Sequence, residues 1–265
     1  MTDTHEMVHG DRAAADETAG VPPVVHREAW LRERDELLAR EKAHMREGDA
    51  IGAARRRLPM TEVDAQLTLT GPDGPTPLLD LFGGREELVA YKHMWHRGEP
   101  FENQCPGCTF AYFAVHDPAY LKARGVSFAV LAQGPWDEVE PFVEFMGYPA
   151  HWYAADGIED PAVGGGEFGW VSFLRQGDRV YLTYETTGRG AEVAMPSLAL
   201  LDMTARGRLE AWQDSPEGWP AGRTPGWFWK SDEDGAGNGW TGGRPTAQWA
   251  RPGATPVVAH GGHHH

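Results

Sequence analysis

"VDAQLTLTGPDGPTPLLDLFGGREELVAYKHMW", residues 63–95, is the stretch of this chain that decides the fold. Its segment QLTLT alternates polar and apolar residues, as a half-buried strand does, and the GPDG that follows is a turn sequence. We interpret PTPLLDLFGG as a short connecting segment and the apolar ELVAYKHMW as a buried strand. The stretch therefore predicts a strand, a turn, a connection and a second strand inside a core.

The chain beyond this stretch alternates between helix and strand signals. Residues 109–125 predict a helical region interrupted near Pro118, and residues 126–133 predict a second buried strand. Residues 135–148 predict an amphipathic helix, and residues 170–186 alternate on either side of RQGD, as a β-hairpin does. Strand, helix and strand in this order form a crossover that joins a parallel pair. We expect an α/β protein with a mixed sheet flanked by helices, in the element order of thioredoxin-like proteins.

The two cysteines, Cys105 and Cys108, lie in the sequence CPGC between the predicted buried strand and the helical region. If the helix begins near Pro106, Cys105 stands at or just before its N-terminus and Cys108 lies one turn inside. The partial positive charge of a helix N-terminus stabilises a thiolate, so Cys105 would attack and Cys108 would resolve a mixed disulfide. Three uses of the pair stay open: reversible disulfide chemistry, half of a metal site, or an unreactive structural pair.

The metal alternative uses His93 and His96 together with Cys105 and Cys108. Two thiolates and two imidazoles suit tetrahedral zinc, and soft thiolates also suit copper(I). Residues three apart in a continuous strand point to opposite faces, so both histidines reach one ion only if the strand breaks between them. We therefore favour no metal site, and the redox chemistry of a dithiol requires no cofactor.

The charge of the chain excludes several classes of partner. The sequence has 24 Lys and Arg against 39 Asp and Glu, a formal net charge of -15, which would repel nucleic acid and anionic membrane surfaces. Its apolar runs are too short to span a bilayer, and its acidic N-terminus has no apolar run of the secretory kind. We therefore expect a cytoplasmic protein, where a cysteine pair serves redox chemistry or metal binding more often than stapling.

Composition divides the chain into four parts. Residues 1–25 are polar and Ala-rich and predict a disordered tail, while residues 26–58 have a helical pattern and form an N-terminal arm. Residues 59–215 hold the strand, helix and hairpin signals and form the main domain. Residues 216–265 are rich in Trp, Gly and Pro, so we expect an irregular extension there.

The N-terminal arm carries apolar residues at seven-residue spacing, with charged residues of both signs on its other faces. These apolar residues are Trp30, Leu37, Ile51 and Leu58. We expect this stripe to be buried, either against the same chain or against a twin subunit in a homodimer.

Two further residues are candidates for substrate contact. Arg189 lies between glycines in the sequence TTGRGAE after the predicted hairpin, where it would meet an anionic substrate or pair with an acidic neighbour. The acidic neighbour is the preferred interpretation. Trp170 begins the predicted hairpin and is the second, aromatic candidate for substrate contact.

Several segments of the chain resemble one known family. REAWLRERDELLAREK, RRRLPMTEVD, LLDLFGGREELVAYKHMW, CPGCTF, TGRG and LLDMTARGR are similar to the bacterial thioredoxin-like family catalogued as domain-of-unknown-function family 899. The resemblance runs from about residue 25 to about residue 230 and implies a thioredoxin-like fold. The chain departs from redox-active thioredoxins in one respect, because GGEFGWVSF has no proline where they place a cis-proline facing the dithiol.

These observations together predict a thiol-disulfide oxidoreductase or a thiol-dependent peroxidase. Cys105 and Cys108 would be its catalytic residues, and its partners would be a thiol or disulfide substrate and a cellular reductant. The alternatives are a non-enzymatic protein that binds zinc or copper through the same cysteines, and an interaction protein that keeps the fold without the chemistry.

Overall fold

The structure is a computed structural model of the 265-residue chain. It describes residues 22–101, 104–113, 115, 117–149, 151–208 and 214. The predicted extension at 216–265 and most of the predicted tail at 1–25 lie outside the described residues.

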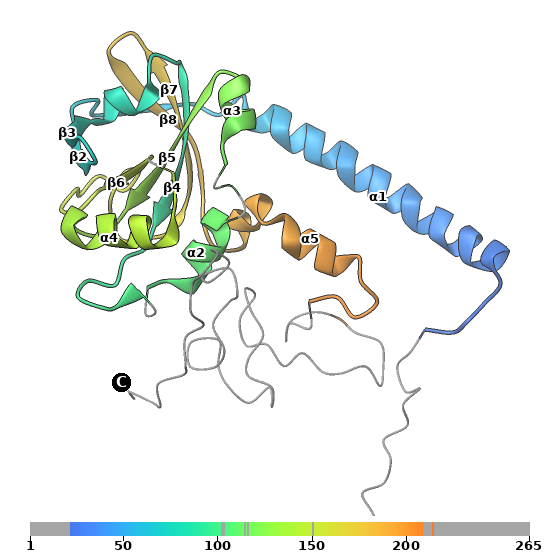
Figure 1. The fold of residues 1–265 in the computed structure, drawn as a ribbon. Coiled ribbons are helices and arrows are strands. Elements are labelled where there is room, and N and C mark those ends of the chain that lie inside the picture. The colour runs from blue at the N-terminus through green and yellow to red at the C-terminus, as the bar shows by residue number, and fades with distance from the viewer. Residues whose placement is uncertain are drawn as a thin grey trace, which may run out of the picture.

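The described strands form one eight-stranded sheet in the order β1-β8-β7-β4-β5-β6-β2-β3 (Figure 1). Their bounds are β1 Thr61–Val63, β2 Thr68–Gly71, β3 Gly74–Pro77, β4 Glu87–His93, β5 Val126–Ala132, β6 Trp152–Ala154, β7 Gly169–Gln176 and β8 Arg179–Thr186. β4 and β5 are parallel, whereas β7 pairs antiparallel with both β4 and β8. The predicted mixed sheet, its parallel pair and its hairpin are therefore confirmed.

Helices occupy the connections between these strands. Their bounds are α1 Arg27–Arg55, α2 Pro106–Phe113, α3 Ala119–Ala123, α4 Trp136–Met146 and α5 Pro196–Asp202, with 3-10 helices η1 Leu78–Phe82 and η3 Gly188–Ala194. α2 and α3 lie between the parallel strands β4 and β5 in the chain, and the β7–β8 hairpin follows and adds to the other side of β4. The chain thus has a thioredoxin-like fold.

The side chains of β4 alternate between two cores, one on each face of the sheet. Leu88 and Ala90 belong to a core that also contains η1, whereas Tyr91 belongs to the core on the other face. We call this second core the dithiol core, because it contains both cysteines. Its buried members are Tyr91, Cys105, Cys108, Ala111, Tyr112, Phe128, Val130, Ala132, Val139, Phe142, Met146, Trp152, Trp170, Ala191, Met195 and Leu198.

α4 shows how the sequence pattern builds this core. Its residues Val139, Phe142 and Met146 recur at three- and four-residue spacing, and all three side chains are buried. Each such burial contributes about 1.5–3 kcal/mol. The helix ends at Gly147, whose φ of 65° is a left-handed conformation that glycine adopts without steric strain. The amphipathic helix predicted at residues 135–148 is therefore confirmed.

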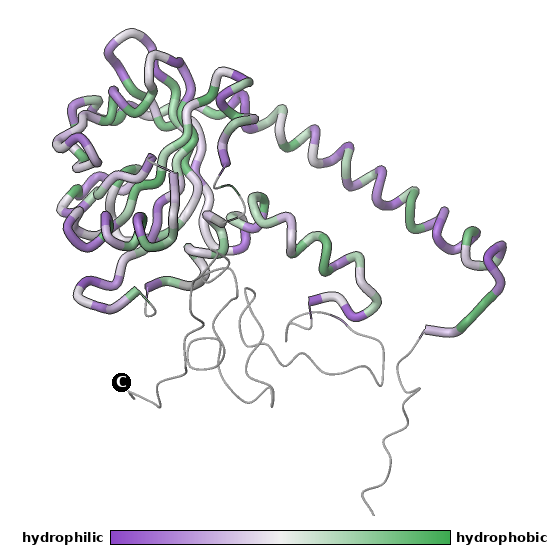
Figure 2. Tube along the Cα trace, viewed as in Figure 1, coloured by the Kyte–Doolittle hydropathy of each residue, from purple (hydrophilic) through white to green (hydrophobic). Residues whose placement is uncertain are grey.

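Most of the N-terminal helix α1 does not pack on its own domain, so one of the two predicted ways to bury its apolar stripe is not observed. Figure 1 shows it extending away from the sheet, and none of its residues is buried. Trp30 and Leu37 are each 49% exposed, and Leu58 lies beyond the end of the helix. Polar and apolar residues alternate along its length (Figure 2), so its narrow apolar stripe has little area to bury. Burial against a twin subunit stays a prediction.

Within the part of the chain that the structure describes, no helix combines the length and the apolar character needed to cross a membrane.

Candidate functional site

The two cysteines lie where β4 ends and α2 begins. β4 ends at His93 and α2 runs from Pro106 to Phe113, so Cys105 directly precedes the helix and Cys108 lies in its first turn. Proline suits the first helical position because a backbone N–H there would have no partner within the helix. The placement that the CPGC sequence predicted is the one observed.

Hydrogen bonds fix the two sulfur atoms differently. The backbone N–H of Cys108 donates to Cys105 Sγ at 3.4 Å, and the backbone N–H of Met94 donates to Cys108 Sγ at 3.4 Å. The carbonyl oxygen of Cys105 accepts from the backbone N–H of Thr109 at 3.1 Å and from its hydroxyl at 3.0 Å. Both cysteines are free thiols. Cys105 Sγ therefore faces the helix N-terminus, while Cys108 Sγ is held against the end of β4.

The pKa values of the two thiols shift in opposite directions. The pKa of Cys105 is lowered, first by a hydrogen bond from the Cys108 thiol and then by the backbone N–H groups of Cys108 and Gly107, against the opposing effect of burial. Burial raises the pKa of Cys108 well above its usual value, and the neighbouring Cys105 raises it further. The pair thus consists of one thiol that ionises more readily than an ordinary cysteine and one that ionises less readily.

Burial also distinguishes the two side chains. Cys105 is 5% exposed and Cys108 is 1% exposed. Cys105 is therefore the more exposed of two buried thiols, and its thiolate is the one that the helix N-terminus favours.

Tyr91 is a member of the site that the sequence analysis missed. Its ring lies 4.6 Å from that of Trp170, centroid to centroid. Burial raises the pKa of the Tyr91 hydroxyl well above its usual value, and the adjacent Cys108 raises it further. Among the described residues this hydroxyl has no hydrogen-bond partner of good geometry, yet it lies close enough to Cys108 for each group to shift the other's pKa. The Tyr91 hydroxyl therefore stays protonated and lies beside the Cys108 thiol.

The side chain of Gln104 holds together the loop between β4 and the dithiol by hydrogen bonds to its backbone. Its side-chain oxygen accepts from the backbone N–H of His96 at 2.9 Å, and its Nε2 donates to the carbonyls of His96 at 2.9 Å and Glu99 at 3.0 Å. The side chain is fully buried, so these bonds satisfy polar groups that would otherwise be costly. No local sequence pattern indicates this role, because it depends on the path of the loop.

His93 is a buried, neutral histidine. Its Nδ1 donates to the carbonyl of Met94 at 2.7 Å, and aromatic rings enclose the imidazole, with that of Trp152 5.1 Å away between centroids. Burial lowers the pKa of His93 to about 4. Among the described residues its Nε2 has no hydrogen-bond partner.

The structure does not bring the predicted metal ligands together. β4 ends at His93, so His96 lies beyond the strand and the argument from opposite strand faces does not apply. Within the described ranges, however, no three His, Cys, Asp or Glu side chains gather closely enough to hold a metal ion. The alternative set of His93 and His96 with the two cysteines is therefore not assembled as a site.

The two predicted substrate contacts lie in different settings. Trp170 is 8% exposed, and its Nε1 donates to the carbonyl of Ala191 at 3.2 Å within the dithiol core. Arg189 forms an ion pair with Glu192, with Nε and Oε1 2.9 Å apart. The acidic neighbour that the sequence analysis preferred for Arg189 is thus present, and a substrate role for either residue stays a prediction.

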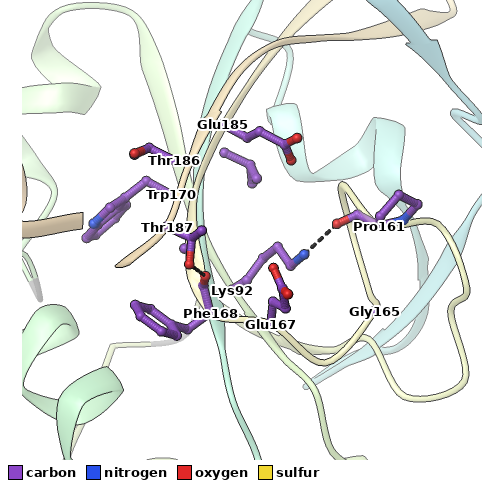
Figure 3. Close-up of a pocket in the computed structure, with 11 residues that line it drawn as sticks. Lys92, Pro161, Gly165, Glu167, Phe168, Trp170, Glu185, Thr186 and Thr187 are labelled. Carbon is purple, nitrogen blue, oxygen red and sulfur yellow. Dashed lines mark hydrogen bonds between the residues drawn. The ribbon is translucent and has the colours of Figure 1, made fainter. Parts of the chain in front are cut away.

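A separate cavity of about 450 Å³ lies at Lys92, which points to the opposite face of β4 from Tyr91. Figure 3 shows the Lys92 side chain reaching the carbonyl of Pro161, to which its ammonium donates, with Glu167 and Glu185 also lining the cavity. Burial lowers the pKa of Lys92, while Glu185 and Glu167 act in the opposite direction. Lys92 therefore ties the segment around Pro161 to the end of the central strand.

Comparison with curated protein sequences gives no match. Among solved structures, a hypothetical protein of Sinorhizobium meliloti 1021 is 16% identical with a TM-score of 0.36, over 49% of this chain and 71% of that chain. A secreted disulfide oxidoreductase of Mycobacterium tuberculosis is 16% identical with a TM-score of 0.32, over 52% and 98%. A peroxiredoxin Q mutant of Xanthomonas campestris is 15% identical with a TM-score of 0.36, over 54% and 97%.

The family comparison covers most of the chain. The sequence model of the family described as "Bacterial protein of unknown function (DUF899)" matches residues 19–234, a span that contains the whole described sheet and both cysteines. This match confirms the resemblance carried by the segments around CPGC. The chain therefore belongs to this bacterial family.

Proposed function

We propose that the protein is a thiol-disulfide oxidoreductase or a thiol-dependent peroxidase in which Cys105 attacks and Cys108 resolves. The observation that carries the proposal is the opposite pKa shift of two free thiols, one at the N-terminus of α2 and one inside its first turn. The thiol with the lowered pKa is the nucleophile that attacks the substrate, and the nearby protonated thiol attacks the resulting mixed disulfide.

With a disulfide substrate, the Cys105 thiolate attacks one substrate sulfur and the substrate S–S bond breaks. One substrate thiolate leaves, and a mixed disulfide forms at Cys105. Cys108 then loses its proton and attacks Cys105 Sγ, which releases the second substrate thiol and forms a Cys105–Cys108 disulfide. Two electrons pass from the protein dithiol to the substrate, and a cellular thiol reductant restores the dithiol by the reverse exchange.

With a hydroperoxide substrate, the Cys105 thiolate attacks the terminal peroxide oxygen and the O–O bond breaks. The alkoxide leaves and takes up a proton to form an alcohol, while Cys105 becomes a sulfenic acid. Cys108 attacks that sulfur, water leaves, and the same internal disulfide results. A thiol reductant again supplies the two electrons that reset the pair.

The proposed chemistry needs no metal or organic cofactor, because the two sulfur atoms carry all the electrons that move. We propose the cytoplasm as its setting, where a pool of reduced thiols keeps such a pair in its dithiol form.

Mass spectrometry of Cys105→Ser and Cys108→Ser after treatment with peroxide or a small disulfide tests the proposal. Cys108→Ser keeps the nucleophile and should accumulate a mixed disulfide or a sulfenic acid at Cys105. Cys105→Ser keeps only the thiol whose pKa is raised, so it should trap nothing and alkylate slowly near pH 7.

Equal reactivity of the two variants, or none in either, would overturn the proposed division of roles. Elemental analysis of reduced protein distinguishes the metal-binding alternative. One tightly held zinc or copper ion per chain, lost on Cys108→Ser, would favour that alternative over redox chemistry.

A further inference from the structure

A groove of about 890 Å³ lies on the sheet face that carries the dithiol core. We call it the sheet groove. Side chains of β4, β5, β7 and β8 form its floor, and the end of α1, α3 and η3 contribute to its walls. Its volume is within the range of about 300–1,000 Å³ that is typical of small-molecule sites.

The floor of the sheet groove follows from strand register. Val89 on β4 lies between its cross-strand partners Phe128 on β5 and Ser172 on β7. The next row on the same face places Tyr91 opposite Trp170. Phe128 and Trp170 line the groove and also belong to the dithiol core. The sheet groove and the dithiol site are therefore successive parts of one face of the sheet.

The walls of the sheet groove expose apolar side chains. Val193 on η3 is 77% exposed, Leu58 is 49% exposed and Met60 is 43% exposed. Together with the floor they make a contiguous apolar surface rather than scattered single residues, and surfaces of that kind mark binding sites. An apolar chain laid in the groove would cover them.

Positive charge lies at the edge of this apolar surface. Arg55 and Arg56 line the sheet groove, and the Arg55 guanidinium carbon lies 4.8 Å from the centroid of the Tyr184 ring. Among the described residues neither arginine forms an ion pair. Glu87 is the one carboxylate among the described lining residues, so two positive charges face one negative charge. In a chain with a formal net charge of -15, this local excess of positive charge favours an anion.

We propose that the sheet groove binds an amphipathic monoanion with a long aliphatic chain, such as a fatty-acid carboxylate. The aliphatic chain would lie on the floor around Val89 and Phe128, and the carboxylate would pair with Arg55 and Arg56. Guanidinium groups bind carboxylates through paired hydrogen bonds, and the apolar floor excludes water from the chain. This inference does not depend on the proposed redox function, because none of the binding contacts involves a cysteine.

Titration of the full-length protein with the fluorescent carboxylate 11-(dansylamino)undecanoic acid, followed by competition with oleate, tests the proposal. We expect saturable enhancement of the dansyl emission and displacement by oleate. The double variant Arg55→Gln/Arg56→Gln should weaken binding about tenfold, since it removes the charged partners. The double variant Arg40→Gln/Arg46→Gln removes the same charge from an exposed part of α1 and should bind as wild type does.

A second pair of variants tests the apolar part. Val193→Glu places a carboxylate at an exposed edge of the groove and should also weaken binding, whereas Met203→Glu, at a residue 82% exposed and outside the groove, should not. Cys105→Ser/Cys108→Ser should bind as wild type does, which separates this site from the redox proposal. No saturable binding, equal loss in groove and control variants, or competition by dodecanol as strong as by dodecanoate would overturn the proposal.

Discussion

Replacement of Tyr91 by phenylalanine would test whether the hydroxyl beside the second thiol assists resolution. Burial has the largest effect on the pKa of Cys108 and raises it, while the Tyr91 hydroxyl acts in the opposite direction. Removing the hydroxyl therefore makes the Cys108 thiolate scarcer. Phenylalanine keeps the ring that packs 4.6 Å from Trp170, so the dithiol core retains its shape.

The size of the effect follows from the chemistry of the second step. A hydrogen bond to a charged group contributes about 1.5–3 kcal/mol, so its loss lowers the thiolate population about ten- to a hundredfold. A more basic thiolate is a better nucleophile, which recovers roughly half of this factor on a logarithmic scale. Resolution should therefore slow about three- to tenfold. The free energy of unfolding should change by less than about 1 kcal/mol, because no well-formed neutral hydrogen bond is lost.

Stopped-flow reaction with 5,5′-dithiobis(2-nitrobenzoic acid) separates the two steps. Attack by Cys105 releases the first thionitrobenzoate, and resolution by Cys108 releases the second. In Tyr91→Phe the first release should keep its rate and the second should slow. Tyr120→Phe, at a residue 77% exposed, is the matched control. An unchanged second phase, or equal slowing of both phases, would refute a role for the Tyr91 hydroxyl in resolution.

Three further predictions concern stability and assembly. Because burial lowers the pKa of His93 to about 4 while an unfolded histidine titrates near 6.5, its contribution to stability is full above about pH 6.5 and is lost as the pH falls toward 4. Chemical denaturation should thus show about 2 kcal/mol more loss between pH 7 and pH 5 in wild type than in His93→Asn, and equal losses would contradict this origin. Leu37 is 49% exposed, so Leu37→Asp should change the free energy of unfolding of the monomer by less than about 0.5 kcal/mol. If α1 pairs two chains, the same substitution should shift the homodimer toward monomer in light scattering. A wild-type chain that is already monomeric would refute pairing through α1. A Cβ added at Gly169 would lie 2.5 Å from the Thr186 carbonyl oxygen, so Gly169→Ala should lower the free energy of unfolding by about 1–3 kcal/mol. Gly48→Ala, in open space on α1, is the control and should not lower it. Equal melting temperatures of the two variants would contradict the predicted clash.

Local sequence patterns were sufficient for the elements that hold the dithiol. The apolar run at β4, the CPGC at the start of α2 and the alternation around the β7–β8 turn each depend on neighbours within a few residues. By contrast, β1 and β6 have only three residues each, which is too short for a period to be recognised. Their pairing with β8 and β5 depends on contacts that are distant in sequence.

The same limit applies to the candidate site. The order of the two roles proposed for the cysteines rests on their distance to the helix N-terminus, which the sequence displays. Tyr91 and Gln104 join the site only because β4 and the following loop bring them to α2, and nothing in their immediate neighbours signals it. For α1 the sequence predicted a buried stripe, and the structure shows none of its residues buried. Seven-residue spacing indicates a face that could be buried, but it does not identify the surface that would bury it.

The dithiol site, the sheet groove and the cavity at Lys92 all contain side chains of β4. The strand contributes to all three because it is buried on both faces and its side chains alternate between them. Tyr91 faces the Cys108 thiol, and Val89, two residues earlier on the same face, forms part of the floor of the sheet groove. Lys92 points to the other face, where its ammonium donates to the carbonyl of Pro161. A one-residue shift in the register of β4 would exchange Tyr91 for Lys92 beside Cys108 and place an ammonium group in the dithiol core. The pairing of β4 with β5 and β7 thus determines the chemistry of the second thiol as well as the packing of the sheet.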